Sequence, residues 1–427
     1  EIRSRLNLLF LWLERAARLL AEPLIPGAVR RRALQRAESW VLERLNGEDG
    51  LGGIYPAMAN AYMALRLRGY DPSQPPCSTA RDALHKLVVE RREEAYCQPC
   101  ASPVWDTGLA CLALQPVADH PGARDAIARG LTWLRERQIL DEPGDWRETH
   151  PDLPGGGWAF QYANPHYPDL DDTAMVGWAM DAAPDSGDYT GAIRRAADWL
   201  AGMQSKNGGF AAFDSDNTCY YLNAIPFADH GALLDPPTAD VSARVLAFLG
   251  RLRGRLDHGP AVERCLDYLR AQQEPFGAWF GRWGTNYIYG TWSVLTALEQ
   301  AGVDMRQDWV RAAVAWLLEV QREDGSWGES NRTYEDTTPP GCDDHGSACH
   351  TAWALLALQA AGEGASDSVA AGVDWLLRQQ ESDGLWSEPW FNAPGFPRVF
   401  YLKYHGYSRY FPLWALTRYR SERNPPA

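Results

Sequence analysis

The sequence has no long hydrophobic run. None of its 427 residues lies in an uninterrupted apolar segment of the ~18 to 20 residues that a membrane-spanning helix needs, although a helix lying on a bilayer stays possible. Basic residues are also fewer than acidic ones. The sequence has 41 Lys and Arg but 55 Asp and Glu, so the formal net charge is −14. Without a run of Lys or Arg to contact phosphates, we expect no nucleic-acid partner.

Cysteine is sparse and scattered. The eight cysteines lack the dense, regular spacing of a disulfide scaffold, which favours a reducing, intracellular setting. Cys97 and Cys100 form a single CxxC with no second CxxC and no His pair at zinc spacing. We therefore favour structural thiols over a metal or redox site, and expect neither a metal nor a cofactor.

Aromatic residues, in contrast, are abundant: 19 Trp, 18 Tyr and 12 Phe. Several Trp end a repeated pattern of Gln, three residues, Gly, one residue and Trp. Its copies are Gln273/Gly277/Trp279, Gln321/Gly325/Trp327 and Gln380/Gly384/Trp386, with looser copies at Gln204/Gly208/Phe210 and Gln138/Gly144/Trp146. A Gln in this place can bond open backbone groups at a helix end while the Trp packs over the turn, so we expect a structural role for these Trp.

Each copy follows an amphipathic helix pattern and precedes a helix of smaller residues, which predicts stacked helical hairpins and an all-α protein. Such hairpins form either an open solenoid or a closed double ring. Inner helices rich in Ala, Gly and Thr could converge around a cavity. We expect residues 101–427 to form one closed ring and residues 1–100 to belong to another helical unit.

The first of these units begins with an apolar block containing Phe10 and Trp12, followed by Arg30, Arg31, Arg32 and Arg36. This is the chemistry of an interfacial amphipathic helix, but also of a core helix with a solvated basic face. The sequence alone leaves both interpretations open.

The segment "DLDDTA" places Asp169, Asp171 and Asp172 at the start of a small-residue helix pattern. A helix N-cap explains one or two of these carboxylates, but not three beside an apolar face. Crowded carboxylates in a low dielectric cannot all ionise, so one can keep its proton. An acid facing an apolar cavity is suited to protonating an alkene.

Two metal-dependent alternatives fit poorly. Asp214, Asp216 and Asn217 make a DxDxN pattern, but the Glu that ends an EF-hand loop is missing. The DDxxD pattern of magnesium-diphosphate chemistry is also absent, because Asp171 and Asp172 are followed by "TAM". The sequence therefore favours a reaction started by protonation.

The chain resembles the squalene-hopene cyclase family of class II triterpene cyclases over essentially its whole length. The resemblance rests on "DLDDTA", the Gln/Gly/Trp repeats, "SPVWDTGLA", "FGRWGTNYIYGT", "IPFADHGALLDPPTADVSAR" and "GFPRVFYLKYHGYSRYFP". It implies an α6/α6 double-ring barrel with part of a second α-α barrel. Because family members have further residues upstream, we expect this chain to lack the N-terminal part.

By that resemblance Asp171 is the proton donor, Asp169 and Asp172 tune its acidity, and Asp240 and Arg244 lie behind them. An Arg at this position should hold the outer aspartates ionised beside a protonated Asp171. The resemblance also implies a cavity wall. It comprises Trp105, Phe160, Phe213 where relatives often have Tyr, Trp283, Tyr289, Phe396, Phe400, Leu402, Tyr404 and Tyr407, with Phe227 at a channel constriction and Ile54, Tyr55 and Pro56 near the deprotonation end.

The implied reaction is an isomerisation of squalene to hopene, or to hopanol when water is added, which is hydro-lyase chemistry in reverse. The implied partners are squalene and a membrane surface, reached monotopically at the cytoplasmic face of the bacterial inner membrane, with a possible homodimer. Three alternatives remain: a cyclase for another polyprenoid, an (α/α)6 glycosidase with paired carboxylates, and a noncatalytic or lipid-binding helical fragment.

Overall fold

The structure, a computed structural model, describes residues 5–228, 233–335 and 338–423. Within these ranges the chain is mainly helical. The regular β structure there is two antiparallel hairpins, β1 (Val88–Glu90) with β2 (Ala95–Cys97) and β3 (Ala393–Phe396) with β4 (Phe400–Leu402). The predicted all-α class is confirmed.

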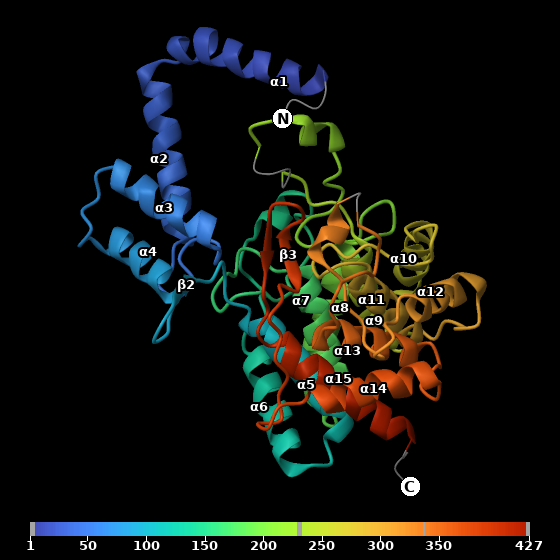
Figure 1. Cartoon of the computed structure of the whole chain (residues 1–427). Helices are drawn as coiled ribbons and strands as arrows, with labels where there is room; N and C mark the ends of the chain where they lie inside the picture. Colours follow the sequence, from blue (N-terminus) through green and yellow to red (C-terminus); the bar gives the residue numbers. More distant parts are fainter. Residues whose placement is uncertain (1–4, 229–232, 336–337, 424–427) are drawn as a thin grey trace.

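Six helices form a closed inner ring in which each contacts the next and the last contacts the first. In order they are α5 (Pro103–Leu114), α7 (Leu170–Asp181), α9 (Ala239–Arg251), α11 (Tyr287–Gln300), α13 (Ala348–Ala360) and α15 (Tyr407–Arg423). The chain therefore forms a closed ring and not an open solenoid. Figure 1 shows this ring as the main body of the molecule.

The inner helices are largely buried because protein surrounds them. Every residue of α7 and of α13 is buried, as expected for helices between an outer layer and a packed interior. Small residues allow neighbouring inner helices to pack closely. A Cβ on Gly177 would lie 2.5 Å from the ring of Phe248 on α9, so a larger residue there would force the two helices apart.

Five further α-helices between α5 and α15 form an outer layer: α6 (Pro121–Arg135), α8 (Thr190–Gly202), α10 (Gly259–Ala271), α12 (Asp308–Glu319) and α14 (Asp367–Gln379). Each contacts the inner helix that precedes it in the chain. They bury one stripe only. In α6 this stripe is Ala123, Ile127, Leu131 and Leu134, spaced three or four residues apart.

The repeated Gln side chains join neighbouring hairpins. Gln321 Nε2 donates to the carbonyl of Gly325 in its own turn (2.9 Å) and to that of Ser368 at the start of α14 (2.9 Å). The Trp327 indole donates to the Leu317 carbonyl (2.8 Å), which closes the turn over α12. Gln204 and Gln273 make the same double contact, so the expected structural role is confirmed.

The first repeat was placed incorrectly from the sequence. Gln138 bonds to the carbonyl of Gly156 (2.8 Å) and the Trp158 indole bonds to that of Leu134 (2.7 Å). The partners of Gln138 are therefore Gly156 and Trp158, and not Gly144 and Trp146. An insertion within this turn hides the correct spacing.

The N-terminal residues form α1 (Arg5–Ala16), α2 (Gly27–Arg44), α3 (Tyr55–Leu67) and α4 (Pro75–Lys86). Helices α1 and α2 stand clear of the ring as a bent arm, and neither contains a buried residue (Figure 1). In this structure they are therefore not core helices. The arm contacts the rest of the chain where the Asn7 amide donates to the Ala224 carbonyl (2.8 Å) and where Arg68 donates to Glu38 on α2 (2.7 Å).

No helix in the described ranges combines the length and apolar character that would let it cross a membrane.

Candidate active site

The acid cluster lies at the N-terminal end of α7. Asp169 is the N-cap, and its Oδ1 accepts hydrogen bonds from the backbone N–H groups of Asp171 (2.7 Å) and Asp172 (3.2 Å). Thr173 continues the turn by donating to the Asp169 carbonyl (2.6 Å). The sequence folds this way because an Asp before a helix satisfies N–H groups that the helix leaves open. Capping therefore explains Asp169 but not the two carboxylates that follow it.

Arg244, on α9, is the cation of the cluster. Its Nε and Nη2 donate to the two oxygens of Asp171, the second at 2.6 Å. Its Nη1 donates to Ser293 Oγ on α11 (2.9 Å), and its Nη2 lies 3.8 Å from Asp240 Oδ2. The expectation that Arg244 holds Asp169 and Asp172 ionised is wrong, because the guanidinium contacts Asp171 and Asp240.

Burial sets the protonation of the three aspartates. It raises the pKa of Asp172 well above the ordinary value, and the charges of Asp169 and Asp171 raise it further. Burial and the Asp171 charge likewise raise the pKa of Asp169 well above its usual range. For Asp171 burial also raises the pKa, but Arg244 opposes the shift. The cluster therefore retains protons, and these reside on Asp169 and Asp172 more readily than on Asp171.

The four carboxyl groups differ in accessibility. The Asp171 side chain is 11% exposed, whereas that of Asp240 is fully buried. Asp172 Oδ1 is buried and has no hydrogen-bond partner among the described residues. Asp171 is therefore paired with Arg244 and also keeps part of its side chain accessible.

Asp240 positions an adjacent loop. Its Oδ2 accepts hydrogen bonds from the backbone N–H groups of Arg282 (2.9 Å) and Trp283 (2.8 Å). Asp235, which was not singled out from the sequence, acts in the same way on another loop by accepting from Phe213 N (2.7 Å) and Asp214 N (2.9 Å). Two carboxyl groups thus fix the segments that carry two predicted cavity residues, Trp283 and Phe213.

A group of rings surrounds the acid cluster. The Trp105 indole donates to the Tyr407 hydroxyl (3.0 Å), which joins α5 to α15. Tyr404 stacks on Tyr407 with ring centroids 4.5 Å apart, and Phe160 meets Tyr404 edge-on at 6.4 Å. The Arg244 guanidinium carbon lies 5.6 Å from the Trp105 ring centre and 5.2 Å from that of Tyr289. Five of the predicted ring residues therefore form one connected wall.

A second group lies on the β3–β4 hairpin and the loop before α11. Phe396 and Phe400 contact each other at 5.3 Å, and Leu402 ends the same hairpin. The Arg282 guanidinium carbon lies 4.2 Å from the Trp283 ring centre and 5.8 Å from that of Phe396. Phe213 is 39% exposed. Asn392, another residue not anticipated, fixes the hairpin by accepting from Tyr404 N (2.9 Å).

The remaining predicted residues lie apart from both ring groups. Ile54, Tyr55 and Pro56 are exposed at the start of α3, where Ile54 bridges to Cys100. Phe227 is 58% exposed in a loop beyond Ala224. Among the described residues, no hydrogen bond or ring contact joins these four to the acid cluster. Nor do three or more His, Cys, Asp or Glu side chains converge in these ranges as a metal site would require.

A fold similar to this closed ring of helices is found in solved type II terpene cyclases. The fold aligns with the type II terpene cyclase MstE from Scytonema (TM-score 0.51, 21% identity, 86% of this chain and 97% of that one). It also aligns with ent-copalyl diphosphate synthase from Streptomyces platensis (TM-score 0.55, 19% identity, 92% and 69%). Because both identities are low, these likenesses establish the fold alone.

The sequence comparisons identify the family. Residues 101–421 match the squalene-hopene cyclase C-terminal domain, and residues 2–93 match the corresponding N-terminal domain. The chain belongs to the squalene-hopene cyclase family. It is 52% identical over 409 residues to a probable squalene–hopene cyclase of Sinorhizobium fredii and 49% identical over 410 residues to the squalene–hopene cyclase of Zymomonas mobilis. The alignments cover 94% of this chain but only 63% and 62% of those proteins, so the chain spans about three fifths of their length.

Proposed function

We propose that the protein containing these residues is a class II terpene cyclase that converts squalene to hopene or hopanol. The observation that carries this proposal is the acid cluster itself. Asp169, Asp171, Asp172 and Asp240 lie together beside a wall of aromatic rings, and the Arg244 guanidinium contacts Asp171 and Asp240 among them. Since burial raises the pKa values of Asp169, Asp171 and Asp172, the cluster keeps at least one proton next to an apolar surface.

Burial raises the pKa of Asp171 even though Arg244 opposes the shift. In the proposed first step Asp171, in its protonated form, gives this proton to a terminal double bond. Arg244 occupies one edge of the carboxyl group, so the proton leaves from the opposite edge toward the substrate. A C–H bond forms, the alkene becomes a carbocation, and the Asp171 carboxylate stays paired with Arg244. Asp172 and Asp169 are protonated, so they add no negative charge to the cluster before the proton is transferred. The final cation loses a proton to give hopene, or takes up water and then releases a proton to give hopanol.

The rings then stabilise positive charge as it moves along the substrate. A desolvated cation against a Trp, Tyr or Phe face gains on the order of 2 kcal/mol or more. Phe160, Trp283, Phe396 and Tyr404, which are partly buried, and Phe400, which is exposed, are the rings that can face a substrate. Trp105, Tyr289 and Tyr407 form a buried layer behind the acid. We assign the first set to cation contact and the second to support of the acid.

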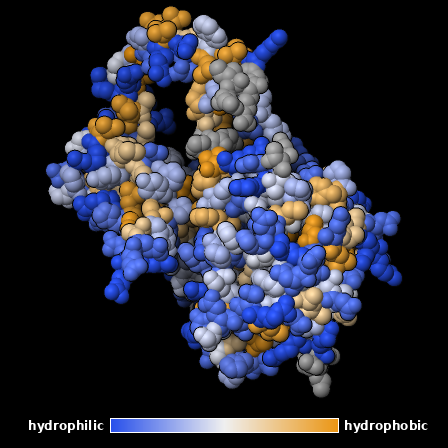
Figure 2. Space-filling view, in the orientation of Figure 1, coloured by the Kyte–Doolittle hydropathy of each residue, from blue (hydrophilic) through white to orange (hydrophobic). Residues whose placement is uncertain are grey.

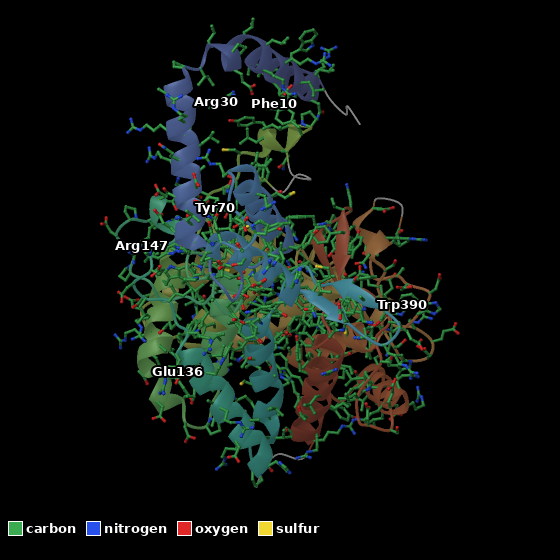
Figure 3. The ribbon with its side chains drawn as sticks, turned by 90° about the vertical axis from the view of Figure 1, so that its left-hand side faces the viewer. Phe10, Arg30, Tyr70, Glu136, Arg147 and Trp390 are labelled. Carbon is green, nitrogen blue, oxygen red and sulfur yellow. The ribbon has the colours of Figure 1, made fainter. Side chains whose placement is uncertain are left out.

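The arm formed by α1 and α2 supports a second part of the proposal, attachment to a membrane surface. Trp12 is 67% exposed and Leu24 is 79% exposed, and Leu8, Leu9, Leu13, Leu19, Leu20, Ile25 and Val29 are exposed near them. Figure 2 shows apolar side chains along this arm, and Figure 3 shows Phe10 and Arg30 on it, away from the ring. Exposed apolar helices flanked by Arg bind the membrane interface. We propose that the protein binds monotopically to the cytoplasmic face of the bacterial inner membrane. We also propose a homodimer, which sedimentation analysis tests.

The reaction is tested by expressing the complete open reading frame that contains these residues. The enzyme is incubated with squalene in detergent, and the extract is analysed by gas chromatography and mass spectrometry. We expect pentacyclic product from the parent, and a loss of at least about 10²-fold in Asp171→Asn because a general acid is removed.

Asp304→Asn, a change of the same kind at an exposed aspartate paired with Arg306, serves as the control and should retain activity. Circular dichroism shows whether each variant is folded. Unchanged squalene with folded parent protein rejects this substrate, while conversion of another polyprenoid supports the alternative cyclase. Conversion retained in Asp171→Asn removes the assigned acid.

A further inference from the structure

The turn that follows α2 packs against the loop before the acid cluster. It comprises residues 46–53, and Asp49 within it is only 8% exposed. Asp49 Oδ2 accepts a hydrogen bond from the backbone N–H of Ala163 (2.5 Å), which lies 114 residues further along the chain. A buried carboxylate is costly unless hydrogen bonds replace its lost hydration. The bond to Ala163 therefore accounts for an acidic residue inside this contact.

Asn46 shapes the turn and reaches the same residue. Its Oδ1 accepts from the backbone N–H groups of Glu48 (3.0 Å) and Asp49 (2.8 Å). Its Nδ2 donates to the Ala163 carbonyl (2.8 Å). Both backbone polar groups of Ala163 are therefore bonded to side chains of one turn, and two bonds to one residue fix its orientation as well as its position.

The turn also contacts the residues on either side of Ala163. The Asn164 amide donates to the Gly52 carbonyl (3.3 Å) and to Gln161 Oε1 (2.9 Å). Gly53 has a φ of 65°, and a Cβ there would lie 2.5 Å from Gln161 Cγ. Glycine permits both this backbone conformation and so close an approach. The turn is therefore packed directly onto this loop.

The loop held in this way carries a ring of the cavity wall. Residues 160–164 form neither helix nor strand, so no regular backbone pairing fixes them. Phe160 lies three residues before Ala163 and meets Tyr404 edge-on, with ring centroids 6.4 Å apart. The Phe160 carbonyl accepts from Val104 N at 3.4 Å, which is long for a hydrogen bond. The shorter bonds that fix this loop are those at Ala163.

We propose that Asp49 is a positioning residue of the active site, which holds Phe160 where it can stabilise a cation. The role rests on the proposed function, in which Phe160 contacts positive charge on the substrate. The attraction between a cation and a ring face acts within about 6 Å of the ring centre. A displaced loop would therefore weaken the stabilisation of one cation, while Asp171 stays in place on α7.

Product composition reports the position of this ring. A poorly stabilised cation loses a proton before the next ring closes. A C–H bond then breaks, its electron pair forms an alkene, and water takes the proton, so the product has fewer rings than the pentacycle. A general defect of folding lowers the yield of every product together and leaves their ratio unchanged. The ratio therefore separates positioning from a purely structural role.

The contact itself is tested without any activity measurement, by hydrogen exchange and mass spectrometry on the complete protein. In Asp49→Ala the peptide that contains Ala163 should exchange faster than in the parent, because its N–H loses its acceptor. Peptides from α11 and α13 should exchange as before. Unchanged exchange at Ala163 overturns the contact. Faster exchange throughout the ring assigns Asp49 to the fold as a whole and overturns the positioning role.

The role is tested on the complete enzyme with squalene. In Asp49→Ala the fraction of incompletely cyclised product should rise severalfold. Asp49→Asn, whose amide oxygen can still accept from Ala163 N, should restore the parent ratio. Glu48→Gln is the matched control, because Glu48 is the neighbouring carboxylate but is exposed and paired with Lys86 (2.8 Å). Its product ratio should match that of the parent.

If circular dichroism shows that Asp49→Ala is unfolded, Asn164→Ala takes its place. This variant loosens the same contact at the Gly52 carbonyl and should shift the product ratio in the same direction. An unchanged ratio in the folded variant overturns the positioning role.

A double variant shows whether Asp49 acts through Phe160. Phe160→Leu alone should also raise the incompletely cyclised fraction. Adding Asp49→Ala should raise it no further, because the ring that the turn positions is already absent. A further rise as large as that of Asp49→Ala alone overturns action through Phe160. A parent that makes no product from any polyprenoid overturns the proposed function and the positioning role with it, while hydrogen exchange still decides the contact between Asp49 and Ala163.

Discussion

Arg244 donates hydrogen bonds to both carboxylate oxygens of Asp171, and its own side chain is almost completely buried. A buried guanidinium at this position affects the three aspartates differently. It favours the ionised form of Asp171 and leaves Asp169 and Asp172, without such a partner, to hold protons. The acid that faces the substrate is thus the stronger acid of the group, and its neighbours are the weaker ones that remain neutral.

Stability should depend on pH through Asp172. Its pKa is raised in the folded state, so the folded chain binds more protons than the unfolded chain between the ordinary pKa and the raised one. Stability is therefore fully present below the unfolded pKa of about 3.9 and is lost as pH rises through the folded pKa. We expect the melting temperature of Asp172→Asn to fall less steeply with pH than that of the parent. Parallel melting curves from pH 4 to 9 would contradict this.

Removal of Arg244 should be costly. Arg244→Gln leaves Asp171 and Asp240 without their cation, and breaking a buried pair in this way typically costs about 3–5 kcal/mol. Denaturant unfolding measures the loss. Arg306→Gln, which breaks an exposed pair with Asp304, should leave the free energy of unfolding almost unchanged. Equal losses in the two variants would show that the buried pair has no special role.

The Gln side chains of the repeats should differ in their contributions. Gln321 bonds to two carbonyls in different hairpins, whereas Gln380 bonds to the single carbonyl of Gly384 (2.8 Å) and is exposed. With each bond contributing about 0.5–1.5 kcal/mol, we expect Gln321→Ala to lose about 1–3 kcal/mol and Gln380→Ala about half as much or less. Chemical denaturation of the two variants side by side provides the comparison.

Membrane binding should depend on the arm. Leu19→Glu combined with Leu24→Glu places two charges on its exposed apolar surface, so sedimentation with phospholipid vesicles should fall severalfold. Leu377→Glu, at another exposed leucine, on α14, is the control and should sediment as the parent does. Reduced binding of the control to the same extent would mean that added charge, and not the arm, is responsible.

Much of the fold was readable because the repeat has a clear physical cause. A Gln that bonds two hairpins and a Trp that closes a turn recur where one helical hairpin meets the next. Gln273 and Gln321 were therefore recognisable from spacing alone. Gln138 was misassigned because its turn contains an insertion, and only the three-dimensional contact with Gly156 reveals its partner. Spacing identifies a repeat only while the loop length is constant.

The acid cluster was predictable for a different reason. Three aspartates within four positions at a helix start exceed what a cap requires, and this signal is local. The direction of the Arg244 contact was not predictable, because it depends on how α9 is placed against α7. Asp235 was missed since its role is to accept backbone N–H groups of a distant loop, which leaves no pattern in the sequence.

The Trp105–Tyr407 hydrogen bond joins residues 302 positions apart and links the first inner helix to the last. All other neighbours in the ring can meet soon after they are synthesised, because each hairpin packs on the one before it. Closure through this pair must wait for α15, and it carries the largest loop-closure entropy of the ring. The wall behind the acid is therefore completed late in biogenesis, so a nascent chain carries its aspartates long before it has assembled a competent acid.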